Sequence, residues 1–292
     1  QDAIRHLTLA GDTYVTSDFR WDLRGADGNS SFSGTLDLAN HTLTRAGTNR
    51  IALVDAVATN AGNIVILEGG ISLARSHVGG VGYINVGTNF VWIENSTVGR
   101  VSKSMIFEGG RLQCSGSAFG LESFITNRSG LLVDNSADLT ISNIISGGGW
   151  LSKSNNGVLR LEAPNTYAGD TTIHAGTLAL GVNGTLGDGA TITLAAGATL
   201  DARAAGGLTV ATGKTLVGEG NINGGLTMAA GATLRVGGPA ATGTLTVTDG
   251  GATVNGATFM KINAATKTTD ALIAQDSIQL GGTLTVDNLG GR

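Results

Sequence analysis

The chain is poor in cysteine, proline, aromatic residues and charge. Cys114 is the only cysteine, there are two prolines, and aromatic residues make up 4% of the 292 residues. A single cysteine excludes an intramolecular disulfide, and no neighbouring residue offers a base that would activate it. We therefore interpret Cys114 as a small buried hydrophobe. High glycine with scarce proline and no Gly-X-Y repeat excludes collagen.

Charged residues are also few, at 14%, and the formal net charge is −4. The lysines and arginines are scattered rather than gathered with aromatics into a basic patch, so nucleic-acid binding is not expected. No apolar run reaches the length of about 18 residues that a membrane-spanning helix needs. We therefore expect neither a nucleic-acid partner nor a membrane span.

The two ends of the sequence indicate an exported chain. It begins Gln1-Asp2-Ala3-Ile4, without an initiator methionine or an apolar leader. We expect that a signal peptide has been removed and that the protein is secreted or displayed on a cell surface. The last repeat runs up to Arg292, so we also expect either a longer chain or end-to-end self-association, because the ends of a stacked sheet are unpaired.

Glycine, by contrast, is abundant, with 47 residues, and much of it belongs to a short repeat. The repeat is glycine, one or two small residues, threonine and an aliphatic residue, spaced about 19 residues apart on average between Leu178 and Val254. A short strand of this kind must stack on its neighbours to bury its apolar side. The pattern predicts an all-β, single-stranded parallel solenoid of roughly 14 coils, at about 20 residues per coil. The glycines that begin the repeat are predicted corners with positive φ. They are Gly176, Gly197, Gly213, Gly231, Gly251 and Gly282.

Two regions differ in texture. Residues 1–145 carry most of the aromatics and less regular strands, predicted at 35–38, 63–67, 83–86 and 91–93 from their period-two alternation. Residues 146–292 are simpler and rich in glycine, threonine and leucine. We interpret the two regions as one continuous solenoid.

The second region opens on motifs that resemble a known family. Residues 145–161 read I-S-G-G-G-W-L-S-K-S-N-N-G-V-L-R-L, followed by N-T-Y-A-G-D-T-T-I at 165–173 and A-G-T-L at 175–178. This order is similar to the autotransporter-associated β-strand repeat, also called the passenger-associated transport repeat. The match over residues 145–186 is close, whereas residues 1–144 match only in style.

The resemblance implies a right-handed parallel β-helix that is exported and displayed outside a bacterial cell. Members of this family include autotransporter passengers and large bacterial surface proteins, in which the repeat is associated with secretion and with building a stalk. This sequence contains neither the family's membrane barrel nor a serine-protease domain.

Catalytic and metal-binding patterns are weak. Asp170, Asp188 and Asp201 have the right side chain for a polysaccharide-active enzyme, but each lies in a turn-like context. A denser charge group, with Asp18, Asp22 and Asp27 beside Arg20 and Arg24, is better explained by surface ion pairs. The histidines show no zinc-site spacing, so we expect no metal and no cofactor, although residues stacked across coils leave a metal site open. They are His6, His41, His77 and His174.

Aromatic side chains are the candidate contacts for a glycan or a partner protein. Tyr83, Phe90 and Trp92 could line one face of neighbouring coils, and Trp21 could do so together with Phe19 and Phe32. The interpretation that we favour is that these rings fill the wider N-terminal lumen or cap the open end, and contact with another subunit is a further alternative.

Three functions therefore remain open. The favoured one is a non-enzymatic extracellular rod, acting as a surface stalk or as a head-to-tail fibre. The second is an adhesin that grips a glycan or another cell through the N-terminal coils, and the third is a polysaccharide-active β-helix enzyme.

Overall fold

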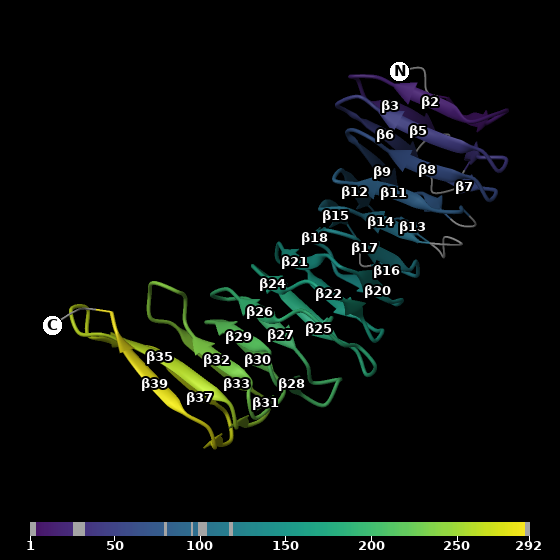
Figure 1. The fold of residues 1–292 in the computed structure, drawn as a ribbon. Helices are drawn as coiled ribbons and strands as arrows, with labels where there is room; N and C mark the ends of the chain where they lie inside the picture. Colours follow the sequence, from purple (N-terminus) through teal and green to yellow (C-terminus); the bar gives the residue numbers. More distant parts are fainter. Residues whose placement is uncertain are drawn as a thin grey trace. The chain divides into compact units, whose positions relative to one another are not determined.

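The chain folds entirely as strands and turns in the part that the computed structural model describes (Figure 1). The described residues are 4–25, 33–78, 81–94, 96–98, 104–116 and 119–289. Within them no segment is helical, and accordingly no helix is long and apolar enough to cross a membrane. The chain is an all-β solenoid, as the glycine repeat predicted.

The chain divides into two compact units. Unit 1 contains residues 1–150 and 165–168, and unit 2 contains residues 151–164 and 169–292. The division into regions 1–145 and 146–292 within one continuous solenoid remains a prediction. The two units are described separately below.

Unit 1 is built from three parallel sheets, and the chain visits them in turn once per coil. Sheet A1 contains β3 (Trp21–Arg24), β6 (Arg50–Val54), β9 (Gly70–Ala74), β12 (Phe90–Glu94), β15 (Gly110–Ser115) and β18 (Gly130–Asn135). Sheet B1 contains β1 (His6–Thr8), β4 (Gly34–Asp37), β7 (Ala56–Thr59), β10 (His77–Val78), β13 (Thr97–Val98), β16 (Phe119–Leu121) and β19 (Leu139–Ile141). Sheet C1 contains β2 (Thr13–Thr16), β5 (Thr42–Ala46), β8 (Asn63–Ile66), β11 (Ile84–Gly87), β14 (Met105–Phe107), β17 (Ile125–Asn127), β20 (Ile145–Gly147) and β23 (Thr166–Tyr167).

The core of unit 1 consists of inward columns of aliphatic side chains. In sheet A1 the register places Ile51, Ile71, Val91 and Leu112 one above the other, and all four are buried. Within each strand, the residues directly before and after these side chains point outward, as the period of two requires. The four strands predicted from alternation are present as β4, β8, β11 and β12, with ends shifted by a residue or so.

Unit 2 is also built from three sheets. Sheet A2 contains β21 (Trp150–Ser154, of which Trp150 belongs to unit 1), β24 (Thr171–Ile173), β26 (Thr191–Leu194), β29 (Thr215–Gly218), β32 (Thr233–Val236), β35 (Ala257–Asn263), β36 (Thr268–Thr269) and β39 (Leu284–Asn288). Sheet B2 contains β22 (Val158–Leu161), β25 (Thr177–Leu180), β27 (Thr199–Asp201), β30 (Asn221–Asn223), β33 (Thr244–Thr248) and β37 (Ala271–Ala274). Sheet D2 contains β28 (Leu208–Val210), β31 (Leu226–Met228), β34 (Ala252–Val254) and β38 (Ile278–Leu280).

Most of the predicted corner glycines have the expected backbone. Gly176, Gly197, Gly213 and Gly231 have φ between 68° and 79°, in the left-handed region that glycine adopts without a Cβ penalty. Gly251 and Gly282 do not have a left-handed φ. The repeat is therefore a corner signal at four of its six sites.

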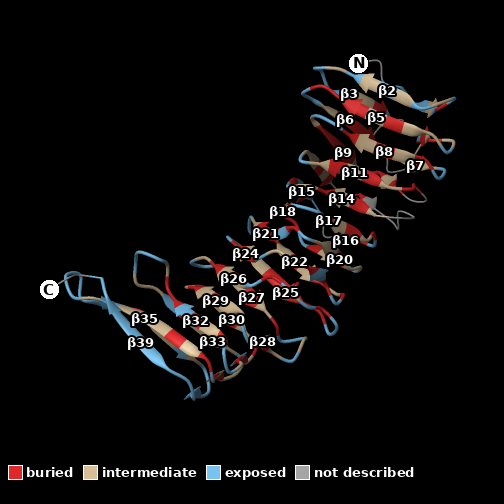
Figure 2. Ribbon diagram, viewed as in Figure 1, coloured by how far each residue is buried: buried red, intermediate tan, exposed pale blue. Residues whose placement is uncertain are grey.

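The last strands of unit 2 are exposed. Figure 2 shows β39 as solvent-exposed along its length, in contrast to the alternation of buried and half-buried residues in β26 and β29. Ile278, Leu280, Leu284 and Val286 are all between 41% and 55% exposed. Three of them continue inward columns, because Ile278 pairs with Ala252, Leu280 with Val254 and Leu284 with Thr258.

Candidate functional site

The outer face of sheet A1 combines aromatic and charged side chains. We define this face by Arg50, Phe90, Trp92, Glu94, Arg111, Gln113 and Asp134, which occupy outward positions of β6, β12, β15 and β18. On β12, Phe90, Trp92 and Glu94 are half-buried and alternate with the buried Val91 and Ile93. The same period of two that builds the core therefore presents both rings on one strand.

Arg50 lies over the Trp92 ring although one coil lies between theirs. Its guanidinium carbon is 4.7 Å from the ring centroid, within the range of a cation–π contact. The intervening coil places Gly70 next to Arg50 and Ser72 next to Trp92 in the register. Because these residues are small, the long arginine side chain can cross the middle coil.

The guanidinium of Arg50 is partly buried from solvent. Burial lowers the pKa of its guanidinium, and Arg20 adds to this effect, whereas Asp22 and Glu94 oppose it. Its Nε is buried and has no hydrogen-bond partner. Because this atom is closed to solvent, Arg50 contributes to the outer face through its contact with the Trp92 ring.

Trp92 and Phe90 are themselves fixed in place. The indole Nε1 of Trp92 donates a hydrogen bond of 3.0 Å to Ser115 Oγ. Phe90 lies against the backbone of Gly70, where an added Cβ would come within 2.5 Å of the ring Cζ. These contacts preorganise both rings.

Polar side chains flank the rings on the following coils. Gln113 Nε2 donates to Asp134 Oδ2 at 3.3 Å, and Arg111 Nη1 lies 4.0 Å from the same oxygen. A ring flanked by an amide, a carboxylate and guanidinium groups provides a flat apolar contact together with hydrogen bonds in both directions. This combination suits a sugar or a polar partner surface.

The structure brings together two of the four predicted contact residues. Phe90 and Trp92 share β12, but Tyr83 precedes β11 in sheet C1, where its N–H donates to Asn63 Oδ1. Trp21 pairs with Ile51 in the register and so belongs to an inward column, where it is half-buried. Phe19 is 80% exposed. Phe32 lies outside the described residues.

The carboxylates considered for catalysis have structural partners. Asp170 Oδ1 accepts the N–H of Thr191, and Asp188 is exposed with one oxygen 3.9 Å from Lys214 Nζ. Asp18 accepts hydrogen bonds from Thr48, and Asp22 pairs with both Arg20 and Arg24. Asp27 lies outside the described residues.

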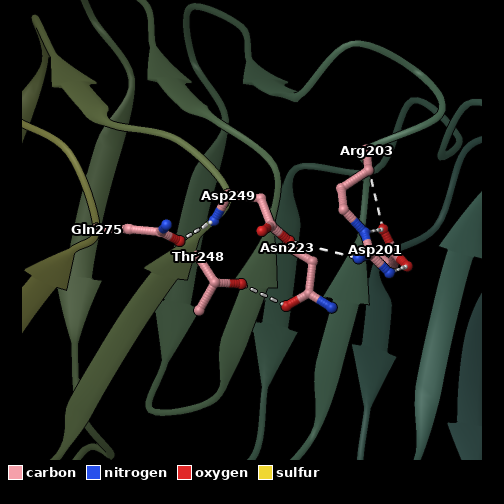
Figure 3. A network of polar contacts seen from close by, with 6 residues as sticks. All are labelled: Asp201, Arg203, Asn223, Thr248, Asp249 and Gln275. Atoms are coloured by element: carbon pink, nitrogen blue, oxygen red, sulfur yellow. Dashed lines mark hydrogen bonds and ion pairs between the residues drawn. The ribbon is translucent and has the colours of Figure 1, made fainter.

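Asp201 belongs to a polar network along sheet B2 (Figure 3). Its carboxylate accepts hydrogen bonds from Nε and Nη2 of Arg203 at 3.0 and 2.7 Å, and Arg203 Nη1 also lies 3.4 Å from Asp249 Oδ2. The hydrogen bond from the Arg203 side chain lowers the pKa of the Asp201 carboxyl, against an opposing effect of burial. The coils that follow extend the network through the Thr248–Asn223 hydrogen bond and through Gln275, which accepts from the N–H of Asp249.

Cys114 and the histidines form no reactive cluster in the described part of the chain. Cys114 is 2% exposed, and burial raises the pKa of its thiol, with Asp134 adding to the effect. His6 shares a hydrogen bond with Thr35, and His41 lies 3.8 Å from Asp12. His77 is half-buried in β10, and His174 is exposed just after β24. Across the described residues, no three His, Cys, Asp or Glu side chains are grouped so as to hold a metal ion.

The lysine of the repeat motif is a buried structural residue. Lys153 is fully buried, and its ammonium donates to the carbonyl oxygens of Ser154, Asn155 and Ala175. Helices and sheets satisfy their own carbonyls, but a corner does not, so a buried donor at this place stabilises the turn. This contact gives the motif's lysine a physical role.

Comparisons with known proteins agree with the motifs. A family model described as passenger-associated-transport-repeat matches residues 151–180. The chain is also 30% identical over 186 residues to the adhesin BmaC autotransporter of Brucella suis biovar 1 (strain 1330). The aligned part covers 62% of this chain but only 5% of that relative, so the chain spans a small fraction of the relative's length. No solved structure matches. The chain thus carries the passenger-associated transport repeat at residues 151–180, as its sequence motifs predicted, and is similar to part of an autotransporter adhesin.

Proposed function

We propose that this chain is a non-enzymatic, extracellular β-solenoid segment of a bacterial surface protein, and that its main role is structural. The observation that carries the proposal is the parallel ladder in each unit, in which every coil stacks on the one before. Such ladders supply stability without a disulfide, a metal or a cofactor. The similarity to an autotransporter adhesin supports secretion or cell-surface display.

The proposal includes finer features that the resemblance implied. We propose that the coils are right-handed, that they number roughly 14, and that they form a rod or stalk. Its ends continue into further chain or join end to end with another copy. Aliphatic side chains exposed on β38 and β39 support this arrangement, because they continue inward columns and would be buried by a further coil.

Electron microscopy of the purified chain tests the structural role. Filaments would support end-to-end joining, and isolated short rods would support a stalk segment. Compact particles without a long axis would contradict the proposal. As a matched pair, Leu280→Lys and Leu284→Lys should shorten or abolish filaments, whereas Leu67→Lys, at an exposed leucine distant in sequence, should not.

A second candidate function is adhesion through the N-terminal coils. The observation that favours it is the outer face of sheet A1, where Arg50 lies on the Trp92 ring and Phe90 lies on Gly70. The ligand would be a glycan or another cell's surface, with Phe90 and Trp92 as the central contacts. Trp21 and Tyr83 stay in the proposal as more distant contacts.

A glycan-binding screen with the purified chain tests adhesion. Phe90→Ala and Trp92→Ala should each weaken any binding by about tenfold or more, since stacking contacts dominate such sites. Tyr14→Ala is the matched control, because Tyr14 is 63% exposed but lies on sheet C1. Equal losses in all three variants would contradict a site on this face.

The third candidate, a polysaccharide-active enzyme, is tested in the same screen. Release of reducing ends from a bound polysaccharide would favour it over adhesion. Asp170→Asn and Asp201→Asn would then be the first variants to examine.

A further inference from the structure

One coil of unit 2 lacks the strand that its neighbours place in the third sheet. The coils that begin with β26, β29, β32 and β35 each supply a strand to sheet D2, namely β28, β31, β34 and β38. The coil formed by β24 and β25 instead continues as an irregular segment, residues 181–190, all of which the structure describes. Sheet D2 therefore begins at β28, and β28 is an edge strand.

A hollow of about 380 Å³ occupies the place of this missing strand. Leu180, Ile192 and Leu208 line it and are each between 5% and 7% exposed. The irregular segment forms its other wall with Leu186 and with Val182, which is 77% exposed. Asn183, Thr185 and Thr209 also line the hollow, so its wall is partly apolar and partly polar. A hollow of this kind beside a strand edge provides room for side chains next to main-chain hydrogen-bonding groups.

The main chain of β28 points its free groups to this side. Leu208 donates its N–H to Gly225 and Val210 accepts from the N–H of Ala229, so both residues face the β31 side of the edge. Along a parallel ladder successive residues face opposite sides, so Thr209, which is exposed, turns its N–H and C=O toward the hollow. Within unit 2's described residues, no main-chain hydrogen bond joins Thr209 to the segment 181–190.

A positive charge at one end of the hollow favours a ligand with a negatively charged group there. Among the described residues that line it, Lys214 alone is charged, and its ammonium lies 3.3 Å from the carbonyl oxygen of Gly187. Asp188 Oδ1 lies 3.9 Å from the same ammonium, but the Asp188 side chain is 79% exposed, so solvent weakens this ion pair. Lys214 follows β28 in sequence, which places it near the carboxyl end of any strand that is added parallel to β28.

From these observations we propose that the edge of β28 is a docking site for an extended peptide segment of a partner protein. The segment adds as a parallel strand, accepts the Thr209 N–H, and donates an N–H to the Thr209 carbonyl. Its alternate side chains are apolar and enter the hollow above Leu208 and Val210, as Leu226 and Met228 of β31 do on the other side. A carboxylate at its end pairs with Lys214. The proposal does not depend on the structural or adhesive role above.

A peptide that copies β31 is the probe. It has the sequence of residues 223–229, is acetylated at its amino end, and ends in a free carboxylate; calorimetric titration into the intact chain measures its binding. Thr209→Pro removes the N–H that faces the hollow and should weaken binding by about tenfold or more. Thr209→Val keeps the N–H and should bind as the unaltered chain does, and Lys214→Gln should weaken binding by several-fold.

Modified peptides test the same contact without altering the protein. N-methylation of the methionine amide removes the N–H that meets the Thr209 carbonyl and should abolish binding. N-methylation of the threonine amide, which faces away, should have little effect. Absence of binding at millimolar peptide, equal loss with both methylated peptides, or a dimer of the chain that the peptide dissociates would each overturn the proposal.

Discussion

Lys153 donates a hydrogen bond from its buried ammonium to the carbonyl oxygen of Ala175, which lies in the following coil. The same ammonium also donates to Ser154 and Asn155, so one side chain joins two successive corners. Lys153 therefore has a structural role in the coil, as a buried hydrogen-bond donor, and is not a surface charge.

Replacement of Lys153 by methionine should therefore destabilise unit 2. Methionine fills a similar volume but leaves carbonyl oxygens without their donor, at a cost of about 2 kcal/mol in the free energy of unfolding. Urea unfolding followed by circular dichroism measures the change. Arg111→Met, at a half-exposed outer position, is the control, and equal midpoints for both variants would contradict the role.

Valine at Gly197 should destabilise its coil through the backbone alone. Gly197 has φ 75°, and an added Cβ would meet no atom within 4 Å. The cost, on the order of 1 kcal/mol or more, comes from placing a β-branched residue in the left-handed region. At Gly231 an added Cβ would also lie 3.0 Å from Thr212 Cγ2, so Gly231→Val should cost at least as much, and asparagine at either site should be tolerated better. Thermal unfolding of the valine and asparagine variants measures this difference, and equal effects of the two residues at Gly197 would refute the backbone explanation.

Cys114 should be unreactive in the folded chain. It is buried, and burial keeps the thiol protonated at neutral pH by raising its pKa. A thiol-specific chromogenic reagent should label it within minutes in strong denaturant and only slowly without denaturant. Rapid labelling of the native chain would show that the coil around β15 opens easily.

The Asp201–Arg203 pair should contribute a small, pH-dependent stability. The pKa of Asp201 is lowered in the folded chain, so its contribution is present above the ordinary aspartate pKa of about 3.9 and disappears as the pH falls through the lower folded value. Because Arg203 is 55% exposed, solvent screens the pair, and Asp201→Asn should lower the unfolding midpoint at neutral pH only slightly.

Unfolding of the Asp201→Asn variant at neutral and strongly acidic pH measures this effect. The difference from the unaltered chain should shrink toward zero in acid and also decrease at high salt. A difference that grows on acidification would have the wrong sign for a lowered pKa.

The period of the coils and the position of most corners can be predicted from the sequence. Gly197 and Gly231 can be identified as corners because a glycine before a strand must often take a positive φ. Gly251 has the same motif, but position 251 requires glycine for a different reason. An added Cβ there would lie 2.7 Å from the carbonyl oxygen of Ser277 in the next coil. A local motif cannot separate a left-handed corner from a close approach between coils.

The outer face of sheet A1 is predictable only in part. Phe90 and Trp92 share a face because they are two residues apart, and that spacing can be read from the chain. The contact of Arg50 with Trp92 depends on the register of three coils and on the small side chains of Gly70 and Ser72 between them. The direction of Trp21 is equally hard to predict, because a shift of one residue decides whether a side chain faces inward or outward.

In each unit, a strand pairs with partners about 20 residues away, as Phe90 does with Gly70 and Arg111. A folded coil thus presents one unpaired edge on which the next segment of the chain can fold. That segment requires no contacts with residues farther away in the sequence. The coils can therefore fold one after another in the order of the sequence. Each folded coil then hinders backward movement of the chain.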